Sequence, residues 1–422
     1  MRYYFVYLGY HLFYYMRKKI LFILLLLGAV IPSQAQRYLN RIFDSVSVQA
    51  DQKYGFNYGY KGDSTNLLLD VYQGYLDTAI NRPLVVLAHG GSFIQGNRKS
   101  ADIVSLCKDL AKRGYVVVSF EYRLGVDILS GKTLEQEFSQ AVLRAAQDGR
   151  AAIRYFYKSA QNGNAFKIDT NQIYTGGISA GGVLGLHLAF LNTKAEMASL
   201  TINADSIGGV EGSSGNAAYS WRVKGVISLC GALANVSWMN DNKAISLCNM
   251  HGTQDATVPY KTDYFKFFGA NVALLQGGFS VDSAAQKQGM DTRLHTFLGA
   301  DHVPFSGSSA TQIKYMDTTT NYVAAYLYKH VTGLIPIGIK ERTVSKNNFL
   351  IYPNPSSEFV EIQFENTAKR NIKLRDMNGK ICCDLDCEEN KITLPINTLS
   401  KGIYLLELYE NGKISSQKII LE

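Results

Sequence analysis

The chain has 422 residues, of which 46% are hydrophobic and 18% charged, which fits a globular protein of about two domains and excludes a wholly disordered one. The formal net charge is +8, but residues 1–35 hold four basic residues and no acidic one, and the remaining 39 basic and 35 acidic residues leave only +4, so nucleic-acid binding is not indicated. The six cysteines form no CxxC pair and no Cys/His array with zinc spacing, so we expect no metal site of that kind.

The first 35 residues have the pattern of a secretory signal peptide. A basic start at residues 16–19 precedes twelve uncharged residues, 20–31, and small residues stand before Gln36 where signal peptidase cleaves. The apolar run is short for a spanning helix, which needs roughly 20 residues. Residues 1–15 indicate either a start codon assigned too early, with Met16 as the true start, or a longer signal-anchor. We expect a mature chain that begins near Gln36.

Residues 36–333 are expected to form the first domain. Short apolar runs typical of strands covered on both faces of a sheet lie at residues 67–72, 84–88, 116–120, 173–176, 226–229, 247–250 and 294–297. Helical patterns lie at residues 101–113, 134–158, 181–191 and 311–331. This alternation predicts an α/β fold with a mostly parallel sheet flanked by helices.

Residues 334–347 are expected to form a linker. Beyond it, residues 348–422 differ from the first domain in their hydrophobic pattern. Short alternating segments lie at residues 359–364, 372–374, 403–408 and 414–421. Asn-Gly pairs at 378–379 and 411–412 are strong hairpin signals between such segments. The tail is therefore predicted to be a small antiparallel β-sandwich, and on these residues alone it could equally be a carbohydrate-binding module.

Residues 177–181 read Gly-Ile-Ser-Ala-Gly, directly after a predicted strand and before an apolar helix. Such a turn places the hydroxyl of Ser179 on a tight strand-to-helix elbow, where it can act as a nucleophile. The glycines are needed because a Cβ at either position would crowd the bend. A Gly/Ser-rich loop without chemistry is the alternative.

Residues 89–93, His-Gly-Gly-Ser-Phe, close another predicted strand. The backbone N–H groups of Gly91 and Ser92, together with that of Ala180 beside the nucleophile, are candidates for an oxyanion hole. A catalytic role for His89 is conceivable, but we expect this histidine to brace the loop by hydrogen bonding.

A serine hydroxyl needs a base, and the base needs a carboxylate that holds its tautomer. Asp255 and His302 each follow a predicted strand, and the order Ser179, Asp255, His302 is that of a known hydrolase fold. Asp301 is a rival acid, but side chains of adjacent residues usually diverge. Asp241 is a weaker alternative.

These motifs together resemble the α/β-hydrolase superfamily over residues 66–333. They are similar to secreted carboxylesterases that carry a His-Gly-Gly loop, a Glu-Tyr-Arg-Leu stretch (here 121–124) and a His-Gly-Thr-x-Asp-x-x-Val-Pro-Tyr acid loop (here 251–260). The resemblance implies no cofactor and no metal. Relatives often have Trp where Phe93 stands, which leaves the shape of the acyl pocket open.

The tail is similar to the C-terminal sorting domain of the type IX secretion system. The similarity is carried by Tyr-Pro-Asn-Pro at 352–355, the Asn-Gly-Lys segment at 378–380 and Gly-Ile-Tyr-Leu at 402–405. It implies a partner in the secretion machinery and export to the surface or exterior of a Gram-negative bacterium. The domain is commonly removed on arrival.

The combined hypothesis is a secreted serine carboxylic ester hydrolase that acts through an acyl-enzyme. The insertion at residues 192–221 is rich in Gly, Ser, Ala and Asn and lacks the continuous amphipathic face of a lipase lid, so we expect short acyl groups such as acetyl, in esters of polysaccharides or small molecules. The alternatives are a serine peptidase of the prolyl-oligopeptidase type, which usually needs a preceding propeller, and a non-catalytic binding protein on the same scaffold.

Overall fold

The computed structural model describes residues 37–200, 202–335, 349–376, 380–410 and 413–422. The chain divides into two compact units, Met1–Pro336 and Ile337–Glu422. The predicted signal peptide with Met16, the linker from residue 336 onward and the two Asn-Gly pairs lie outside the described residues.

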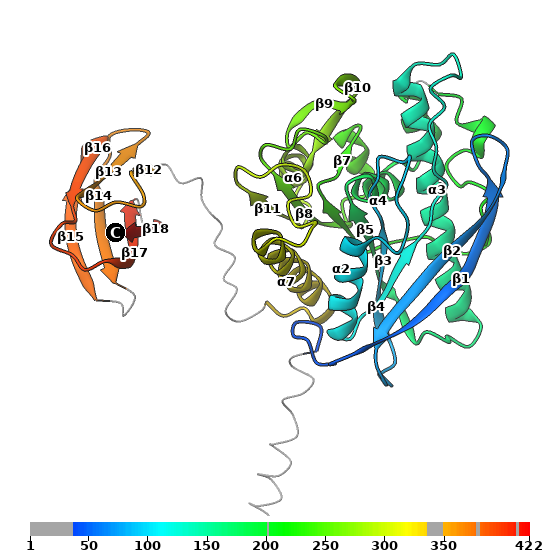
Figure 1. The fold of residues 1–422 in the computed structure, drawn as a ribbon, viewed down its shortest axis with the longest axis horizontal. Helices are drawn as coiled ribbons and strands as arrows, with labels where there is room; N and C mark the ends of the chain where they lie inside the picture. The colour runs from blue at the N-terminus through cyan, green and yellow to red at the C-terminus, as the bar shows by residue number, and fades with distance from the viewer. Residues whose placement is uncertain (1–36, 201, 336–348, 377–379, 411–412) are drawn as a thin grey trace, which may run out of the picture. The chain divides into compact units, whose positions relative to one another are not determined.

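The first unit is built on an eight-stranded sheet with the strand order β1-β2-β4-β3-β5-β6-β8-β11 (Figure 1). The strands are β1 (Val46–Tyr58), β2 (Ser64–Gly74), β3 (Arg82–Ala88), β4 (Val116–Phe120), β5 (Ile168–Ile178), β6 (Gly225–Leu229), β8 (Ser246–Gly252) and β11 (Thr292–Phe297). All pairings from β4 to β11 are parallel, whereas β2 pairs antiparallel with both β1 and β4. The predicted mostly parallel sheet is confirmed.

Helices cover both faces of this sheet, as the apolar strands require. They are α2 (Ala101–Lys112), α3 (Leu134–Gln161), α4 (Ala180–Phe190) and α7 (Ala310–Thr332), which match the four predicted helices. On β3, Leu84 and Val86 belong to a core shared with α3 and α4, while Val85 and Leu87 belong to a core shared with α2 and α7. Successive side chains of a strand point to opposite faces, so each strand feeds two cores.

Several elements of the first unit were not predicted from the sequence. They are β1, β7 (Ala232–Leu233), β9 (Thr262–Phe267), β10 (Ala270–Gly277), α5 (Lys194–Ala198), α6 (Gly278–Lys287) and the 3₁₀ turns η1 (Asp205–Ile207) and η2 (Val236–Asp241). Strands β7, β10 and β9 form a separate small sheet. Most residues of β1 and β9 are exposed or half-buried, so neither strand carries a clear apolar pattern.

The second unit consists of two antiparallel sheets. Strands β12 (Phe349–Tyr352), β13 (Phe359–Phe364) and β16 (Lys391–Pro395) form one, and β14 (Arg370–Asp376), β15 (Ile381–Cys387), β17 (Gly402–Glu410) and β18 (Lys413–Leu421) form the other. Side chains of both sheets, such as Val360 and Leu406, share one core. This is the predicted antiparallel β-sandwich. In the part of the chain that the structure describes, no helix is both long and apolar enough to cross a membrane.

Candidate active site

Ser179 lies on a sharp elbow between β5 and α4. Its backbone has φ 55° and ψ −118°, a conformation that L-residues rarely adopt and that cooperating contacts must hold. A Cβ on Gly177 or on Gly181 would lie 2.1 Å from the carbonyl oxygen of Ala88, so both positions must be glycine. The Ser179 N–H donates to the carbonyl of Leu229 at 2.8 Å, which ties the elbow to β6.

Three predicted side chains from separate loops meet at this elbow. The Oγ of Ser179 lies 2.8 Å from Nε2 of His302, and Nδ1 of His302 lies 2.7 Å from Oδ2 of Asp255. Asp255 follows β8 and His302 follows β11, at the carboxyl ends of neighbouring parallel strands. Serine, imidazole and carboxylate therefore form one continuous hydrogen-bonded chain.

The carboxylate of Asp255 is fully buried and surrounded by donors. Its Oδ1 accepts the N–H groups of Thr257 and Val258 at 2.9 and 2.8 Å, and its Oδ2 lies 3.1 Å from Nε2 of His251. Burial alone would raise the pKa of Asp255, but hydrogen bonds from His251 and His302 outweigh it and lower that pKa to about 2. The carboxylate is therefore charged at neutral pH and able to orient an imidazole.

The two rival acids lie elsewhere. Oδ1 of Asp301 accepts the N–H groups of Ala256 and His302 at 2.9 and 2.7 Å, so this carboxylate joins the two loops through their backbones. Asp241 is exposed at the end of η2. The carboxylate bonded to the His302 imidazole belongs to Asp255.

The predicted oxyanion loop is tightly folded. Gly91 and Ser92 have φ of 120° and 53°, and a Cβ on Gly91 would lie 2.0 Å from the carbonyl oxygen of Gln95. Within the described residues, the N–H groups of Gly91, Ser92 and Ala180 donate to no other group. Three backbone donors near Ser179 are thus left for a ligand.

His89 lies beneath this loop and is fully buried. Its Nδ1 lies 2.7 Å from the carbonyl of Gly90, and its ring stacks on Tyr122 with 4.4 Å between centroids. The hydroxyl of Tyr122 donates to the carbonyl of His89 at 3.0 Å. These contacts hold the loop and do not involve Ser179.

A cavity of about 180 Å³ opens beside Ser179. Its walls are mainly apolar and include Phe93, Phe138, Val183, Leu200, Trp238 and Phe265. Leu200 comes from the insertion at residues 192–221, so that segment, although rich in Gly, Ser, Ala and Asn, also contributes to the apolar wall. The sequence did not show how Phe93 shapes this pocket. In the structure its side chain forms the cavity wall on the side of the predicted oxyanion loop.

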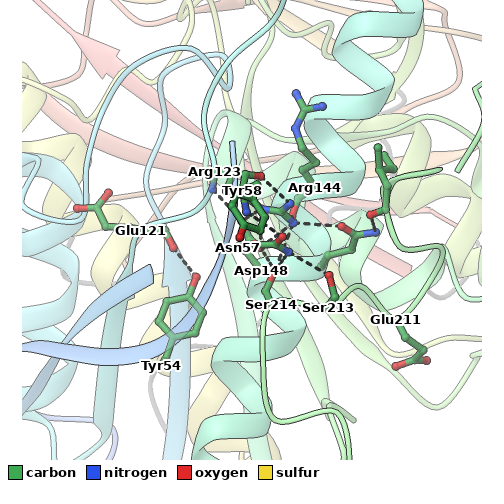
Figure 2. A network of polar contacts seen from close by, with 12 residues as sticks. Tyr54, Asn57, Tyr58, Glu121, Arg123, Arg144, Asp148, Glu211, Ser213 and Ser214 are labelled. Carbon is green, nitrogen blue, oxygen red and sulfur yellow. Dashed lines mark hydrogen bonds and ion pairs between the residues drawn. The ribbon is translucent and has the colours of Figure 1, made fainter. Parts of the chain in front are cut away.

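A buried polar network ties this insertion to α3 and to the segment after β4 (Figure 2). The Arg123 guanidinium binds both carboxylate oxygens of Asp148 at 2.9 and 3.0 Å, and Ser214 of the insertion donates to the same carboxylate at 2.5 Å. Two residues further along α3, Arg150 donates to the carbonyls of Leu188 and Val210. Asp148 and Arg150 therefore tie α3 to the insertion, which supplies Leu200 to the cavity wall.

Cys230 is the third ligand-type side chain beside Asp255 and His302. One potential ligand atom of each lies within 4.8 Å of the others, and this is the one such set found among the described residues. Burial raises the pKa of the Cys230 thiol to about 12, and Asp255 adds to that shift. Because the carboxylate and imidazole already bind each other and the thiol stays protonated, the set in this arrangement is a hydrogen-bonding site and not a preformed metal site.

Two family matches agree with this geometry. Residues 69–246 match the BD-FAE family, and residues 350–422 match the secretion system C-terminal sorting domain. The first unit is thus an α/β-hydrolase of the esterase kind, and the second is a secretion sorting domain. The first match includes the oxyanion loop and Ser179 and ends before Asp255.

Similar solved structures include a thermophilic esterase from the planctomycete Thermogutta terrifontis. Its propionate-bound and native forms are 19% and 20% identical to this chain with TM-scores of 0.46, and the alignments cover 70% of this chain and 97% and 95% of that chain. The same esterase phosphorylated by paraoxon is 19% identical with a TM-score of 0.45, over 70% of this chain and 97% of that chain. No curated protein matches the chain.

Proposed function

We propose that the first unit is a serine carboxylic ester hydrolase in which Ser179 is the nucleophile, His302 the general base and Asp255 the orienting acid. The observation that carries the proposal is the hydrogen-bonded chain, 2.8 Å from Ser179 to His302 and 2.7 Å from His302 to Asp255. The N–H groups of the predicted oxyanion loop, which have no acceptor among the described residues, support the proposal.

In the first half-reaction, Ser179 Oγ attacks the ester carbonyl carbon while Nε2 of His302 takes the hydroxyl proton. The negative charge that develops on the carbonyl oxygen is stabilised by two N–H groups, that of Ala180 and that of either Gly91 or Ser92. His302 then passes its proton to the departing alkoxide, and the alcohol leaves behind an acyl-enzyme.

In the second half-reaction, water replaces the alcohol. His302 takes a proton from this water, whose oxygen attacks the acyl carbonyl, and the same proton returns to Ser179 Oγ as the carboxylic acid departs. Throughout, the buried negative charge of Asp255 stabilises the imidazolium form of His302.

The cavity lies on the acyl side of this reaction centre. The leaving oxygen must approach Nε2 of His302 to receive its proton, so the alcohol occupies the side of Ser179 that faces His302. The cavity is lined by Ser179 and Ala180 but not by His302. The sequence predicts acetyl or similar short acyl groups, although the cavity has room for a longer chain. The predicted alcohol component is a hydroxyl group of a polysaccharide.

The second unit supports export. We propose that this sorting domain engages the type IX secretion machinery and directs the hydrolase to the cell surface or the exterior, after a signal peptide at residues 1–35 has guided passage across the inner membrane.

Replacement of the nucleophile tests the proposal. Ser179→Ala should lower kcat for p-nitrophenyl acetate by on the order of 10⁶ without unfolding the protein. Ser228→Ala is the matched control, because Ser228 is also buried, on neighbouring β6, and its hydroxyl has no hydrogen-bond partner in the described chain. More than about a hundredth of wild-type activity in Ser179→Ala would exclude this nucleophile. Cleavage of peptide p-nitroanilides faster than any ester would favour the peptidase alternative. Absence of all hydrolysis would favour the non-catalytic binding protein.

A further inference from the structure

His187 is a deeply buried polar side chain in the wall of the cavity. It is 2% exposed and stands on α4, eight residues after Ser179. Ser179, Val183 and His187 recur at intervals of four residues, so they share one face of the helix, and all three line the cavity. At 1.5 Å per residue, His187 lies roughly 12 Å beyond Ser179 along the helix axis. The cavity therefore extends from the nucleophile to this imidazole.

The two ring nitrogens of His187 have different roles. Nδ1 lies 2.8 Å from the carbonyl oxygen of Val183, so Nδ1 carries the proton and donates it. Burial, more than any other influence, lowers the pKa of His187 to about 4, against the hydrogen bond to Val183, which favours the charged form. The ring is then neutral at pH 7, and Nε2 is left with a lone pair that can only accept.

This acceptor has no partner in the described chain. None of the described hydrogen bonds involves Nε2, and Nε2 is not among the fully enclosed polar atoms that lack a partner, so this nitrogen keeps some exposure in a residue that lines the cavity. Trp238 packs edge to face against the ring with 5.7 Å between centroids and holds it in place. A buried acceptor without a donor is costly, which indicates that a ligand or a water supplies one.

The other polar groups of the cavity do not compete at this depth. Glu135 and Ser199 are exposed, Ser92 and Ser139 are only half-buried, and Asn235 already accepts the N–H of Ser237 at 2.9 Å. Apart from Ser179 itself, His187 is the buried polar side chain among those that line the cavity. A donor that reaches the part of this mainly apolar cavity beside α4 and Trp238 therefore meets Nε2 of His187.

We propose that His187 determines acyl specificity by accepting, through Nε2, a hydrogen bond from a hydroxyl group at the far end of the substrate's acyl chain. This rests on the proposed function, which places the acyl group in the cavity. The preferred substrates are esters of terminally hydroxylated acids of about six carbons, because such a chain spans much of the roughly 12 Å between Ser179 and His187. An apolar cavity of roughly 150 Å³ holds a benzene molecule, so about 180 Å³ accommodates a chain of this size.

The wall opposite this helix is fixed before substrate binds. Arg150 donates to the carbonyl of Leu188, next to His187, and to that of Leu191 at 3.0 and 2.6 Å. It also binds the insertion that supplies Leu200 to the cavity. A preformed site with one acceptor discriminates by leaving that acceptor unpaired when the hydroxyl is absent.

Matched ester pairs test the inference in the full-length protein. kcat/KM is measured for p-nitrophenyl hexanoate and 6-hydroxyhexanoate, and for propionate and 3-hydroxypropionate, whose hydroxyl is too near the ester to reach His187. Wild type should prefer the hydroxylated six-carbon ester by on the order of tenfold and show no such preference in the short pair.

Two substitutions separate hydrogen bonding from packing. His187→Phe keeps a ring against Trp238 but removes the acceptor, so the hydroxyl preference should vanish, whereas His187→Gln keeps an acceptor oxygen and should retain part of it. His295→Phe is the control, because this half-buried histidine on β11 packs on Phe297 and Tyr322, away from the cavity, and its variant should keep the full preference.

The outcomes distinguish the two levels of the argument. Hydrolysis of all four esters by wild type without a hydroxyl preference, or with one that persists in His187→Phe, overturns this inference and leaves the proposed function standing. Absence of ester hydrolysis by wild type overturns both. If His187→Phe does not fold, the inference is decided by the ratio of kcat/KM for the hydroxylated and plain six-carbon esters in wild type, and by the change of that ratio in His187→Gln.

Discussion

His251 Nε2 lies 3.1 Å from Oδ2 of Asp255, the carboxylate oxygen that also binds His302. Nδ1 of His251 accepts the N–H of Gly278 at 3.2 Å, so the ring proton is on Nε2, which faces both Asp255 and the carbonyl of Val258 at 3.0 Å. His251 therefore donates to the carboxylate and to its loop, and is a positioning residue behind the candidate acid.

Removal of this donor should weaken catalysis through Asp255. His251→Phe keeps an aromatic ring but leaves the buried carboxylate with one donor fewer, so we expect kcat to fall roughly tenfold and stability by about 1–3 kcal/mol. The test is a double-mutant cycle on kcat with Asp255→Asn. If His251 acts through Asp255, its substitution costs little in the Asp255→Asn background; equal costs in both backgrounds would show an independent structural effect.

The two neighbouring carboxylates should respond differently to the same substitution. Asp255→Asn removes the charge that orients His302 and should lower kcat roughly 10⁴-fold. Asp301→Asn retains the side-chain oxygen that accepts from Ala256 and His302, so its activity should stay within about threefold of wild type. Steady-state kinetics on p-nitrophenyl acetate decide, and the reverse ranking would assign the acid to position 301.

Asp255 should also contribute a pH-dependent part of stability. Its pKa falls from an ordinary 3.8 to about 2 on folding, so the contribution is present above about pH 4 and is lost as the pH falls toward 2. The unfolding free energy of wild type minus that of Asp255→Asn should shrink by about 2 kcal/mol between pH 5 and pH 2.5.

Tryptophan fluorescence reports this transition. Both tryptophans of the chain, Trp221 and Trp238, belong to the first unit, so urea titrations at the two pH values follow that unit and not the sorting domain. A constant difference between wild type and variant would show that the pKa of Asp255 is similar in the folded and unfolded states.

Strong apolar patterns explain what the sequence could predict. The runs at β3 and β4 are buried along their whole length, α2 and α3 have an amphipathic pattern, and α4 is a continuous apolar run that is buried on every side. Most residues of strands β1 and β9 are exposed or half-buried, so these strands lack the apolar pattern by which a strand is recognised in a sequence. Ser179, Asp255 and His302 could be singled out because each follows a strand, and the structure brings them together, while their catalytic roles remain proposals.

Tertiary contacts were beyond the sequence. His251 contacts the carbonyl of Val258 in its own loop, and its approach to Asp255 depends on how the loop after β8 turns back. His187 could not be singled out from the sequence, because a run of apolar residues does not show that a cavity lies beside the helix. Leu200 reaches that cavity from the insertion, which the network around Asp148 ties to α3.

Gly181 should resist substitution although it lies in a helix. Alanine is intrinsically favoured over glycine there by about 1 kcal/mol, but its Cβ would lie 2.1 Å from the carbonyl oxygen of Ala88, a backbone atom that cannot move aside. We expect Gly181→Ala to cost about 2–3 kcal/mol in stability and to displace Ser179 enough to lose most activity. Gly149→Ala in α3 is the control, since its nearest neighbour at 2.7 Å is a movable methyl group of Leu188. Equal losses in both variants, by thermal unfolding and ester hydrolysis, would contradict this account of the elbow.

A larger residue at position 183 should shorten the cavity and change the acyl preference. Val183 stands one helical turn beyond Ser179, between the nucleophile and His187, and its side chain lines the cavity. In Val183→Phe the added ring occupies space that an acyl chain longer than acetyl needs, so the ratio of kcat/KM for p-nitrophenyl hexanoate to that for the acetate should fall at least roughly tenfold, mainly through the hexanoate. Val104→Phe, at a half-buried valine of α2 on the opposite face of the sheet, is the control and should leave the ratio unchanged. An unchanged ratio in a folded Val183→Phe would mean that the acyl group lies outside this cavity, and the acyl and alcohol sides would then have to be exchanged.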